Sequence, residues 1–455
     1  MPLPFSKLLV ANRGAAAARI LRTAKAMGLG TVAVYSEADA GLPYLAMADE
    51  ALPVGGAAPR DSYLNQDALL DAARRSGAEA VHPGYGFLSE NAEFAARVAA
   101  AGMTFIGPSP QHIDAMGHKA RARDTVVAHG MPVAASSTVL GEAADEIAAI
   151  AASIGYPVMV KPAAGGGGIG MAAARGEAEL LKVVERARSM AARSFGVPDV
   201  YLEKLLEKPR HVEFQILADR AGNVCHVFER DCSVQRRHQK VIEEAPAPGL
   251  DRAIVDAMAD RVVGAMCGVG YDNIGTVETL FTAEDGFSFL EVNTRLQVEH
   301  AVTEAITGLD LVALQIRLAG GEPLASVLPE VPTPRGHAIQ ARIYAEDPVR
   351  FLPSPGPLTV FRLAEGEGIR IETGYAEGSA ITPFYDPMIA KVIAHGPDRL
   401  SAIQRLDAAL AESRIEGVRT NIPFLRAVLA HPAFREGAVH TGLVPEVLAA
   451  ASATA

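Results

Sequence analysis

The chain has 455 residues, 49% hydrophobic and 21% charged, so it is long enough for several domains and has a globular composition. A formal net charge of −11 without a basic tail argues against nucleic acid as the main partner. The longest mostly apolar stretch, residues 147–160, is shorter than a membrane span and contains Gly155 and Pro157, so we expect no membrane partner.

The cysteines and the N-terminus indicate a cellular compartment. Cys225, Cys232 and Cys267 form no C-x-x-C pair and cannot all join in disulfides. Residues 1–6 are too short for a signal peptide and lead directly into a strand pattern. These features predict a protein of the reducing cytoplasm.

Strand and helix patterns alternate over the first 113 residues, which predicts an open parallel sheet. Ligands of such sheets bind at the carboxyl ends of the strands, where Asn12-Arg13-Gly14 and residues 82–87 fall. Packing at the start of the next helix explains Asn12-Arg13-Gly14 equally well. Strands are predicted at 7–11, 31–35, 80–81 and 104–107, and helices at about 15–27 and from an N-cap at Ser89 or Asn91 toward Ala101.

Residues 111–204 are predicted to form a smaller unit, with helix signals at 110–129 and its clearest strand at 156–161. Lys161 ends that strand, and four consecutive glycines follow at 165–168. Glycines let backbone N–H groups turn together toward an anion, and the lysine adds a charge beside them. We interpret this segment as a lid over nucleotide phosphates, although a flexible linker has a similar composition.

Residues 210–216 alternate with period two, which places His211, Glu213 and Gln215 on one face of a strand. A returning strand is predicted at 224–228. The next segment, 229–240, is rich in Arg, His and Lys, but acids are interleaved with them. The pattern therefore favours a pocket for a small anion over a polyanion surface.

Residues 275–281 and 287–295 are predicted to be two strands joined by a two-residue turn at Asp285-Gly286. Such a turn pairs Glu284 with Phe287 and thereby fixes which side chains of the two strands share a face.

In this register Glu278 lies opposite Asn293 and diagonal to Glu291. Opposed Cβ atoms are about 5 Å apart and diagonal ones about 7–8 Å. Two carboxylates and an amide oxygen at that spacing suit Mg²⁺. A hydrogen-bonded cross-strand patch is the alternative, and a turn one residue longer would move Glu278 to the other face.

Residues 291–300, E-V-N-T-R-L-Q-V-E-H, form the most informative segment. As one continuous strand they carry too many polar groups on one face for an ordinary half-buried strand. We expect this face to carry the chemistry. It holds Glu291, Asn293, Arg295, Gln297 and Glu299, and the apolar face holds Val292, Leu296 and Val298.

Together these segments resemble the biotin carboxylase family, the ATP-grasp component of biotin-dependent carboxylases, over residues 5–445. The resemblance rests on seven strings. They are A-N-R-G at 11–14, H-P-G-Y-G-F-L-S-E-N at 82–91, the glycine loop at 165–171, E-R-D-C-S-V-Q-R-R-H-Q-K-V-I-E-E-A-P at 229–246, residues 291–300, R-G-H-A at 335–338 and P-F-Y-D-P-M-I-A-K at 383–391.

The resemblance implies an α/β (α+β overall) fold of the ATP-grasp class. The implied domains are an N-terminal Rossmann-like parallel-sheet domain at 1–113, a helical linker and mobile ATP-grasp lid at 114–204, an ATP-grasp core at 205–330, a C-terminal antiparallel-sheet domain at 331–446 and a tail at 447–455, of which 449–455 is expected to be frayed.

The implied activity is ATP- and bicarbonate-dependent carboxylation of biotin on a separate carrier protein, via carboxyphosphate. The chain would be the biotin carboxylase subunit of an acyl-CoA carboxylase, such as the acetyl-CoA carboxylase of fatty acid biosynthesis. The family uses ATP, Mg²⁺ or Mn²⁺, bicarbonate and biotin. Expected partners are a biotin carboxyl carrier protein, carboxyltransferase subunits and a second copy in a homodimer. The sequence contains no Met-Lys dipeptide of an A-M-K-M biotinylation site, so biotin should arrive on the carrier.

The resemblance also implies residue roles. ATP is bound by Lys119, Lys161, Gly167, Gly168, Glu203, Lys204, Leu206, His211, Gln235, His238, Glu278, Leu280 and Glu291. The metal is held by Glu278, Glu291 and Asn293. Bicarbonate is held by Lys240, Arg295, Gln297 and the backbone of Val298. The catalytic set is Arg295, Lys240, Glu299 as general base and Arg342, which stabilises the biotin enolate. Arg295 and Lys240 should lower the pKa of Glu299 so that it stays ionised.

The chain departs from the family pattern without losing a catalytic group. The departures are Ala15-Ala16, His118, Ile169, Ala301 and Ala26, the last in place of an acid of the dimer contact.

Two other functions suit an ATP-binding fold. A carboxylate–amine ligase is disfavoured by Gln297-Val298-Glu299 and Arg342, and a non-catalytic scaffold is disfavoured by the complete polar set.

Overall fold

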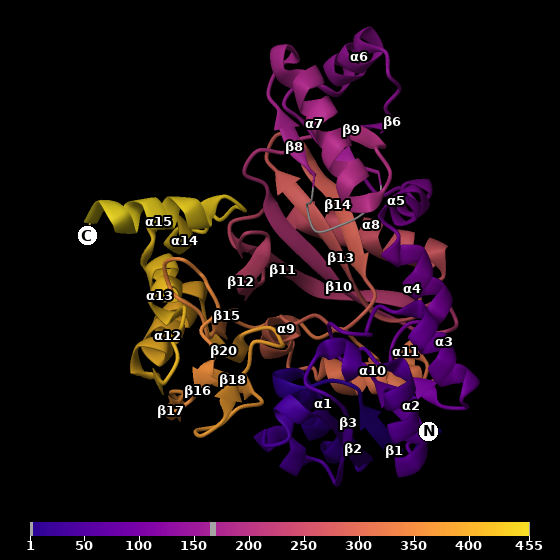
Figure 1. Cartoon of the computed structure of the whole chain (residues 1–455), viewed down its shortest axis with the longest axis vertical. Helices are drawn as coiled ribbons and strands as arrows, with labels where there is room; N and C mark the ends of the chain where they lie inside the picture. Colours follow the sequence, from indigo (N-terminus) through magenta and orange to yellow (C-terminus); the bar gives the residue numbers. More distant parts are fainter. Residues whose placement is uncertain (1–2, 164–169, 455) are drawn as a thin grey trace. The chain divides into compact units, whose positions relative to one another are not determined.

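The computed structural model describes residues 3–163 and 170–454, so the predicted phosphate contacts Gly167 and Gly168, and Ile169, lie outside the described residues. The chain forms two compact units (Figure 1). Unit 1 comprises Met1–Met131, Arg210–Thr279 and Leu290–Ala455, and unit 2 comprises Pro132–Pro209 and Leu280–Phe289.

Unit 1 begins with the predicted parallel sheet, in the order β3-β2-β1-β4-β5. The central strand is almost wholly apolar and buried, as a parallel strand covered on both faces must be. β3 escaped prediction because it is an edge strand in which only Val54 is buried and Pro53 interrupts the pattern. The strands are β1 (Lys7–Val10), β2 (Gly30–Ser36), β3 (Glu50–Gly55), β4 (Ala80–His82) and β5 (Thr104–Phe105).

The helices of this region confirm the predicted alternation. Asn91 caps α3, because its side-chain oxygen accepts a hydrogen bond of 2.7 Å from the Phe94 N–H. Asn12 donates through Nδ2 to the carbonyls of Pro83 and Tyr85, at 2.6 and 2.9 Å, and thus joins the two strand ends. The helices are α1 (Gly14–Ala26), η1 (Glu37–Asp39), η2 (Pro43–Met47), η3 (Pro59–Asp61), α2 (Gln66–Ser76) and α3 (Ala92–Ala100).

The helix predicted at 110–129 is divided into α4 (Pro110–Gly117) and α5 (Lys119–Ala128). His118 has an extended backbone and caps α5 through its ring, which accepts from the Arg121 N–H at 3.4 Å. Gly117 precedes it and has a low helix propensity. The break places Lys119 at a helix start.

An eight-stranded sheet has the order β14-β13-β10-β11-β12-β15-β20-β18 and lies mostly in unit 1, whereas residues 280–289 of the β13–β14 hairpin belong to unit 2. The pairs from β10 to β18 are antiparallel. The strands are β10 (Arg210–Ala218), β11 (Val224–Arg236), β12 (Gln239–Ala245), β13 (Asn273–Thr282), β14 (Gly286–Asn293), β15 (His337–Tyr344), β18 (Ile369–Thr373) and β20 (Met388–Gly396).

One hydrophobic core joins the two sheets of unit 1, because Leu8 and Val10 belong to the same buried cluster as Ile339, Val392 and Leu406. The remaining helices are α8 (Arg252–Val269), α9 (His300–Thr307), α10 (Leu311–Ala319), α11 (Leu324–Val327), α12 (Arg399–Glu412), α13 (Ile422–Ala430), α14 (Pro432–Arg435) and α15 (Leu443–Thr454). Two short sheets pair β16 (Gly356–Pro357) with β19 (Ala380–Ile381) and β17 (Val360–Arg362) with β21 (Arg414–Glu416).

Unit 2 has its own four-stranded sheet, in the order β6-β9-β7-β8. Its core includes Ile147, Val158, Leu180 and Leu202. The strand predicted at 156–161 is present as β7. The elements are β6 (Ser136–Val139), α6 (Ala144–Ile154), β7 (Val158–Pro162), β8 (Ala172–Ala174), α7 (Glu177–Phe195) and β9 (Val200–Lys204).

Two predictions about the β13–β14 hairpin are wrong. Three residues, 283–285, separate the strands, so Glu284 lies in the turn and is not paired with Phe287. The Thr282 hydroxyl closes this turn by accepting from the Asp285 N–H at 2.9 Å. The second strand ends at Asn293 and does not continue through residues 294–300.

The end of the chain also differs from expectation. The tail at 449–455 was predicted to be frayed, but α15 continues to Thr454. Alanine has the highest helix propensity, and this segment is rich in it. No helix in the described part of the chain combines the length and apolarity that a membrane crossing requires.

The cap of α3 gives a first prediction. Asn91→Ala should lower the free energy of unfolding by about 1 kcal/mol, because it leaves the Phe94 N–H without its acceptor. Ser89→Ala is the matched control and should not lower it, because the buried Ser89 hydroxyl has no hydrogen-bond partner among the described residues. Urea unfolding followed by circular dichroism measures both, and a larger loss for Ser89→Ala would contradict the cap assignment.

Candidate active site

The ammonium group of Lys240 lies at the centre of a polar cluster in unit 1. Its Nζ is 2.6 Å from Glu213 Oε2, 2.7 Å from Glu278 Oε1 and 2.8 Å from Glu299 Oε1. The lysine side chain is only 13% exposed. An ammonium has three N–H donors, and each of them meets a carboxylate here.

These contacts set the protonation states of the cluster. Burial by itself lowers the pKa of Lys240, but the charges of Glu213, Glu278 and Glu299 outweigh it and raise the pKa well above its ordinary value. Burial by itself raises the pKa of Glu278, but Lys240 and His211 hold it well below the usual range. The lysine and Glu278 are therefore both charged at neutral pH.

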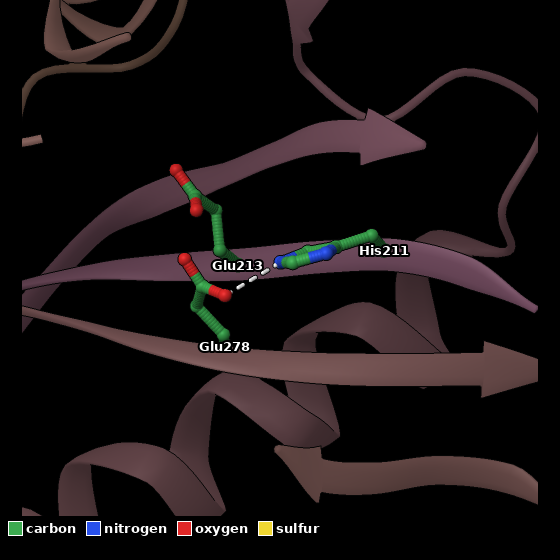
Figure 2. Close-up of side chains that lie close together, drawn as sticks. All are labelled: His211, Glu213 and Glu278. Atoms are coloured by element: carbon green, nitrogen blue, oxygen red, sulfur yellow. Dashed lines mark ion pairs between the residues drawn. The ribbon is translucent and has the colours of Figure 1, made fainter. Parts of the chain in front are cut away.

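His211, Glu213 and Glu278 lie together on the adjacent strands β10 and β13 (Figure 2). His211 Nε2 is 2.9 Å from Glu278 Oε2. Gln235 Nε2 lies 2.8 Å from His211 Nδ1, the other nitrogen of the ring. The predicted nucleotide contacts His211 and Gln235 thus touch each other, and His211 also touches the predicted metal ligand Glu278.

Arg230 supports the cluster from within the sheet and is fully buried. Its Nε donates to Glu213 Oε1 at 2.5 Å, and its Nη1 donates to Gln215 Oε1 at 3.0 Å. These contacts confirm that Glu213 and Gln215 share a face. Glu213 therefore joins two cations, Arg230 and Lys240.

The residues after β14 reach the cluster as a loop. Arg295 donates to Gln297 Oε1 at 2.7 Å and to Asn293 Oδ1 at 2.9 Å. Gln297 Nε2 donates to Glu278 Oε1 at 3.1 Å. The predicted strand is wrong here, yet its polar side chains converge, because partners across the site draw them together.

Glu90 anchors this loop from the N-terminal region. One of its oxygens accepts from Arg295 Nε at 2.9 Å, and the other accepts from the Thr294 N–H at 3.2 Å. Burial lowers the pKa of Arg295, but the Glu90 charge and other acids raise it above its ordinary value. The H-P-G-Y-G-F-L-S-E-N segment thus contributes a positioning acid to the site.

Glu299, the predicted general base, is fully buried between Lys240 and Arg342. Arg342 Nη2 donates to Glu299 Oε2 at 2.9 Å, and Arg342 Nε donates to Glu243 Oε1 at 2.5 Å. Burial alone raises the pKa of Glu299, but Lys240, Arg342 and Arg230 outweigh it and hold the pKa well below the ordinary value. The residue is ionised, as predicted, and the guanidinium that contacts it belongs to Arg342 rather than Arg295.

The predicted metal ligands offer the oxygen donors that a hard divalent cation takes. Glu278 Oε1 accepts from Asn293 Nδ2 at 2.7 Å, so these two side chains meet as predicted even though the turn is one residue longer than expected. Glu291 Oε2 lies 2.8 Å from Lys119 Nζ. These oxygens already attract ammonium and amide groups, and the donor set fits Mg²⁺, although a bound ion would have to replace some of these contacts.

Other predicted site residues lie on two different parts of the fold. In unit 1, His238 lies with Arg237 in the two-residue turn between β11 and β12, and both have positive φ angles, 66° and 51°. In unit 2, Lys161 forms an ion pair with Glu203, and Lys204 Nζ donates to the Gly155 carbonyl at 3.2 Å. Also in unit 2, Leu206 is buried and Leu280 is half-buried.

Several contact residues were not predicted as site residues. Glu213 was noted only for its face, and Glu90, Arg230 and Glu243 were part of motifs without an assigned role. Their charges are visible in the sequence, but their partners lie on distant strands. The one sequence signal available for Glu213 was an ionisable residue within an alternating strand pattern that predicts burial.

Comparison with known proteins gives the family. The model described as "Biotin carboxylase, N-terminal domain" matches residues 4–113, "Carbamoyl-phosphate synthase L chain, ATP binding domain" matches 118–327 and "Biotin carboxylase C-terminal domain" matches 340–446. The biotin carboxylase of Halalkalibacterium halodurans is 50% identical over 440 residues, which are 97% of each chain. The chain belongs to the biotin carboxylase family.

Other relatives broaden this family assignment. A pyruvate carboxylase subunit of Methanothermobacter thermautotrophicus is 48% identical over 97% of this chain and 90% of its own. The biotin carboxylase domain dimer of 2-oxoglutarate carboxylase from Hydrogenobacter thermophilus, solved with MgADP, ADP and bicarbonate, superposes with a TM-score of 0.90 at 42% identity, over 98% of this chain and 99% of its own. The predicted ATP-grasp fold class is confirmed.

Removing the central ammonium tests the electrostatics of this family site. In Lys240→Gln, Glu213, Glu278 and Glu299 lose their shared cation, and we expect a loss of about 3–5 kcal/mol of unfolding free energy near pH 8. In the native protein the depressed pKa of Glu299 contributes stability above its unfolded pKa, which is lost as pH falls through the folded pKa. In Lys240→Gln, burial raises the pKa of Glu299. Protonation of Glu299 at low pH then removes the free-energy cost of a buried carboxylate that has lost its lysine.

The difference between the two proteins should therefore be smaller at pH 5 than at pH 8, as measured by chemical unfolding at both pH values. Lys25→Gln is the matched control, because Lys25 and Asp49 form an exposed ion pair of 3.0 Å. A Lys240→Gln deficit that is equal at both pH values would contradict the account of the charged cluster.

Proposed function

We propose that the protein uses ATP and bicarbonate to carboxylate biotin that a separate carrier protein presents. The observation that carries this proposal is the buried, ionised Glu299 between Lys240 and Arg342, in a chain of the biotin carboxylase family. A buried carboxylate of this kind is ready to accept a proton from an acid brought beside it. Bicarbonate is such an acid.

In the first step, bicarbonate is held by Arg295, Gln297, Lys240 and the backbone of Val298, and Glu299 takes its proton. A bicarbonate oxygen then attacks the γ-phosphorus of ATP. The new P–O bond replaces the bond to the β-phosphate, so ADP leaves and carboxyphosphate forms. Positioning and charge neutralisation drive such a transfer. Bound Mg²⁺ on Glu278, Glu291 and Asn293 would neutralise phosphate charge, and Lys119 lies beside that set.

In the second step, carboxyphosphate separates into CO₂ and phosphate. Phosphate takes the proton of the biotin ring nitrogen, and that nitrogen attacks CO₂. Arg342 stabilises the enolate oxygen of biotin in this step. Its guanidinium contacts both Glu243 and Glu299, so the groups for the two steps adjoin each other.

The nucleotide roles of the remaining residues are part of the same proposal. In unit 1 they belong to Lys119, His211, Gln235, His238, Glu278 and Glu291. In unit 2 they belong to Lys161, Glu203, Lys204, Leu206 and Leu280, with Gly167 and Gly168 outside the described residues. Closure of a lid at 133–203, which excludes water from carboxyphosphate, and the domain limits at 113, 204, 330 and 446 remain predictions.

We further propose a cytoplasmic homodimer that works with a biotin carboxyl carrier protein and carboxyltransferase subunits. Support for a dimer comes from the Hydrogenobacter relative, which was solved as one. Support for the compartment comes from Cys225, Cys232 and Cys267, all of which are free thiols. An acyl-CoA acceptor remains our proposal, because relatives named for pyruvate and 2-oxoglutarate carboxylation share the same fold.

ATP turnover gives the direct test. With ATP and Mg²⁺, phosphate release should rise on addition of bicarbonate and rise again with free biotin. Glu299→Gln should lower the biotin-stimulated kcat about 10²- to 10⁴-fold, the usual contribution of a general base. Glu330→Gln, at an exposed position, is the matched control and should retain the native rate. Turnover indifferent to both additions would favour a scaffold, and stimulation by an amine instead would favour a carboxylate–amine ligase.

Arg342→Gln should separate the two steps. Loss of the guanidinium removes charge stabilisation from the biotin enolate, so stimulation by biotin should fall about 10²- to 10³-fold. Bicarbonate-dependent phosphate release without biotin should fall far less, because Lys240 still pairs Glu299. Phosphate-release assays with and without biotin measure both rates, and equal losses would place Arg342 in the first step instead.

A further inference from the structure

The backbone of the Gln297–Val298–Glu299 turn is held from behind by two side chains. Lys391 Nζ donates to the Val298 carbonyl at 2.8 Å. His300 Nδ1 lies 2.7 Å from the Gln297 carbonyl, which can only accept, so Nδ1 is the donor. Two successive peptide groups of the proposed bicarbonate loop are therefore fixed by their oxygens.

Fixing the oxygens also fixes the N–H groups. In a trans peptide the C=O and the following N–H point in opposite directions. The N–H groups of Val298 and Glu299 thus point away from His300 and Lys391. Across residues 3–163 and 170–454, neither of these two N–H groups has a hydrogen-bond acceptor. Two free donors on one turn are suited to an anion.

The sheet explains why Lys391 reaches this turn. On the antiparallel strands β15, β20 and β18, Lys391 lies directly opposite both Arg342 and Glu372. Directly opposed residues share a face. One row of the sheet therefore delivers Arg342 to the Glu299 carboxylate and Lys391 to the neighbouring Val298 carbonyl.

Lys391 is itself rigidly held. It is fully buried, and its Nζ forms an ion pair of 2.5 Å with Glu372 Oε2. Burial lowers the pKa of Lys391 despite that acid. Burial by itself raises the pKa of Glu372, but Lys391 and Arg370 hold it well below its usual range. The protonated and the neutral amine both carry N–H donors, so the contact with Val298 does not depend on the charge state.

The acids behind the turn do not indicate a second metal site. His300, Glu304 and Glu372 place ligand atoms within 4.8 Å of one another. However, Arg370 pairs with both acids, and Arg19 Nη2 lies 2.8 Å from Glu304 Oε1. The charges are already compensated by side-chain cations, which leaves support of the turn as the role of this network.

We propose that Lys391 and His300 are positioning residues, which hold the Val298 and Glu299 N–H groups toward bicarbonate. This inference rests on the proposed function for the identity of the anion. It predicts a selective effect on bicarbonate, because both side chains contact the turn that is assigned to bicarbonate.

Lys391→Met removes the donor and keeps the length of the side chain. The KM for bicarbonate should rise about tenfold, the loss expected for one hydrogen bond from a charged group. The KM for ATP should stay within about twofold, because this turn is assigned to bicarbonate alone. A folded Lys391→Met protein with an unchanged KM for bicarbonate, or with equal rises in both KM values, would overturn the proposal.

His300 offers a matched pair of variants that does not depend on how well a buried methionine is tolerated. Asparagine can place its side-chain N–H where Nδ1 lies, and glutamine places it near Nε2 instead. His300→Asn should keep the native KM for bicarbonate, and His300→Gln should raise it severalfold. Equal behaviour of the two variants would contradict a role for the Nδ1 donor.

Amide hydrogen exchange of the 297–300 segment gives a readout that is independent of turnover. Exchange at Val298 and Glu299 should be faster in Lys391→Met and His300→Gln than in His300→Asn and the native protein. Bicarbonate should slow it in the native protein only if bicarbonate is the bound anion. Native exchange that bicarbonate leaves unchanged would contradict the proposed function, whereas equal exchange in all four proteins would contradict the positioning role.

Discussion

The contact of one ammonium group with three carboxylates is the constraint on which the site depends. Lys240, on β12, meets Glu213 on β10, Glu278 on β13 and Glu299 in the loop after β14. Buried charges are tolerated only when they are paired, so the arrangement of these four chain segments is fixed together. The result of assembling them is a cluster in which Glu278 and Glu299 stay ionised. The ionised form of Glu299 is what a general base needs.

An anion must compete for this lysine. All three of its N–H donors face carboxylates, and Arg295 is likewise occupied by Glu90, Gln297 and Asn293. Bicarbonate binding therefore exchanges contacts within a preformed set rather than filling an empty one. The backbone N–H groups of Val298 and Glu299 differ in that, within the described part of the chain, they have no acceptor before the anion arrives. This is why the supports behind them, Lys391 and His300, matter to affinity.

Much of the fold followed from local pattern. The apolar strand at 7–11, the alanine-rich helix and the Asn91 cap were predictable because propensity, burial and capping agree there. The segment 291–300 was wrongly predicted as one continuous strand. A loop whose side chains converge on shared partners can show the same period-two polar pattern. Glu90, one of those partners, lies more than two hundred residues away in sequence, and no local pattern contains it.

The proposed roles of the site residues came from the family resemblance, whereas their hydrogen-bond and ion-pair partners came from the structure. The expectation that Arg295 and Lys240 keep Glu299 ionised holds for Lys240, and the charge of Arg295 also interacts with Glu299, but it missed Arg342. Residues 342 and 299 meet only when β15 joins the sheet. Glu213 was visible on the correct face, but its significance needs Lys240 and Arg230 beside it.

The source of the new oxygen atom in the released phosphate tests the central claim, that this cluster presents bicarbonate to the γ-phosphate of ATP. With ¹⁸O-labelled bicarbonate and unlabelled ATP, each phosphate released by the native protein should carry one ¹⁸O atom, detected by mass spectrometry, because the attacking oxygen stays on phosphorus when CO₂ departs. Phosphate that instead takes its new oxygen from water would show simple ATP hydrolysis and contradict the account.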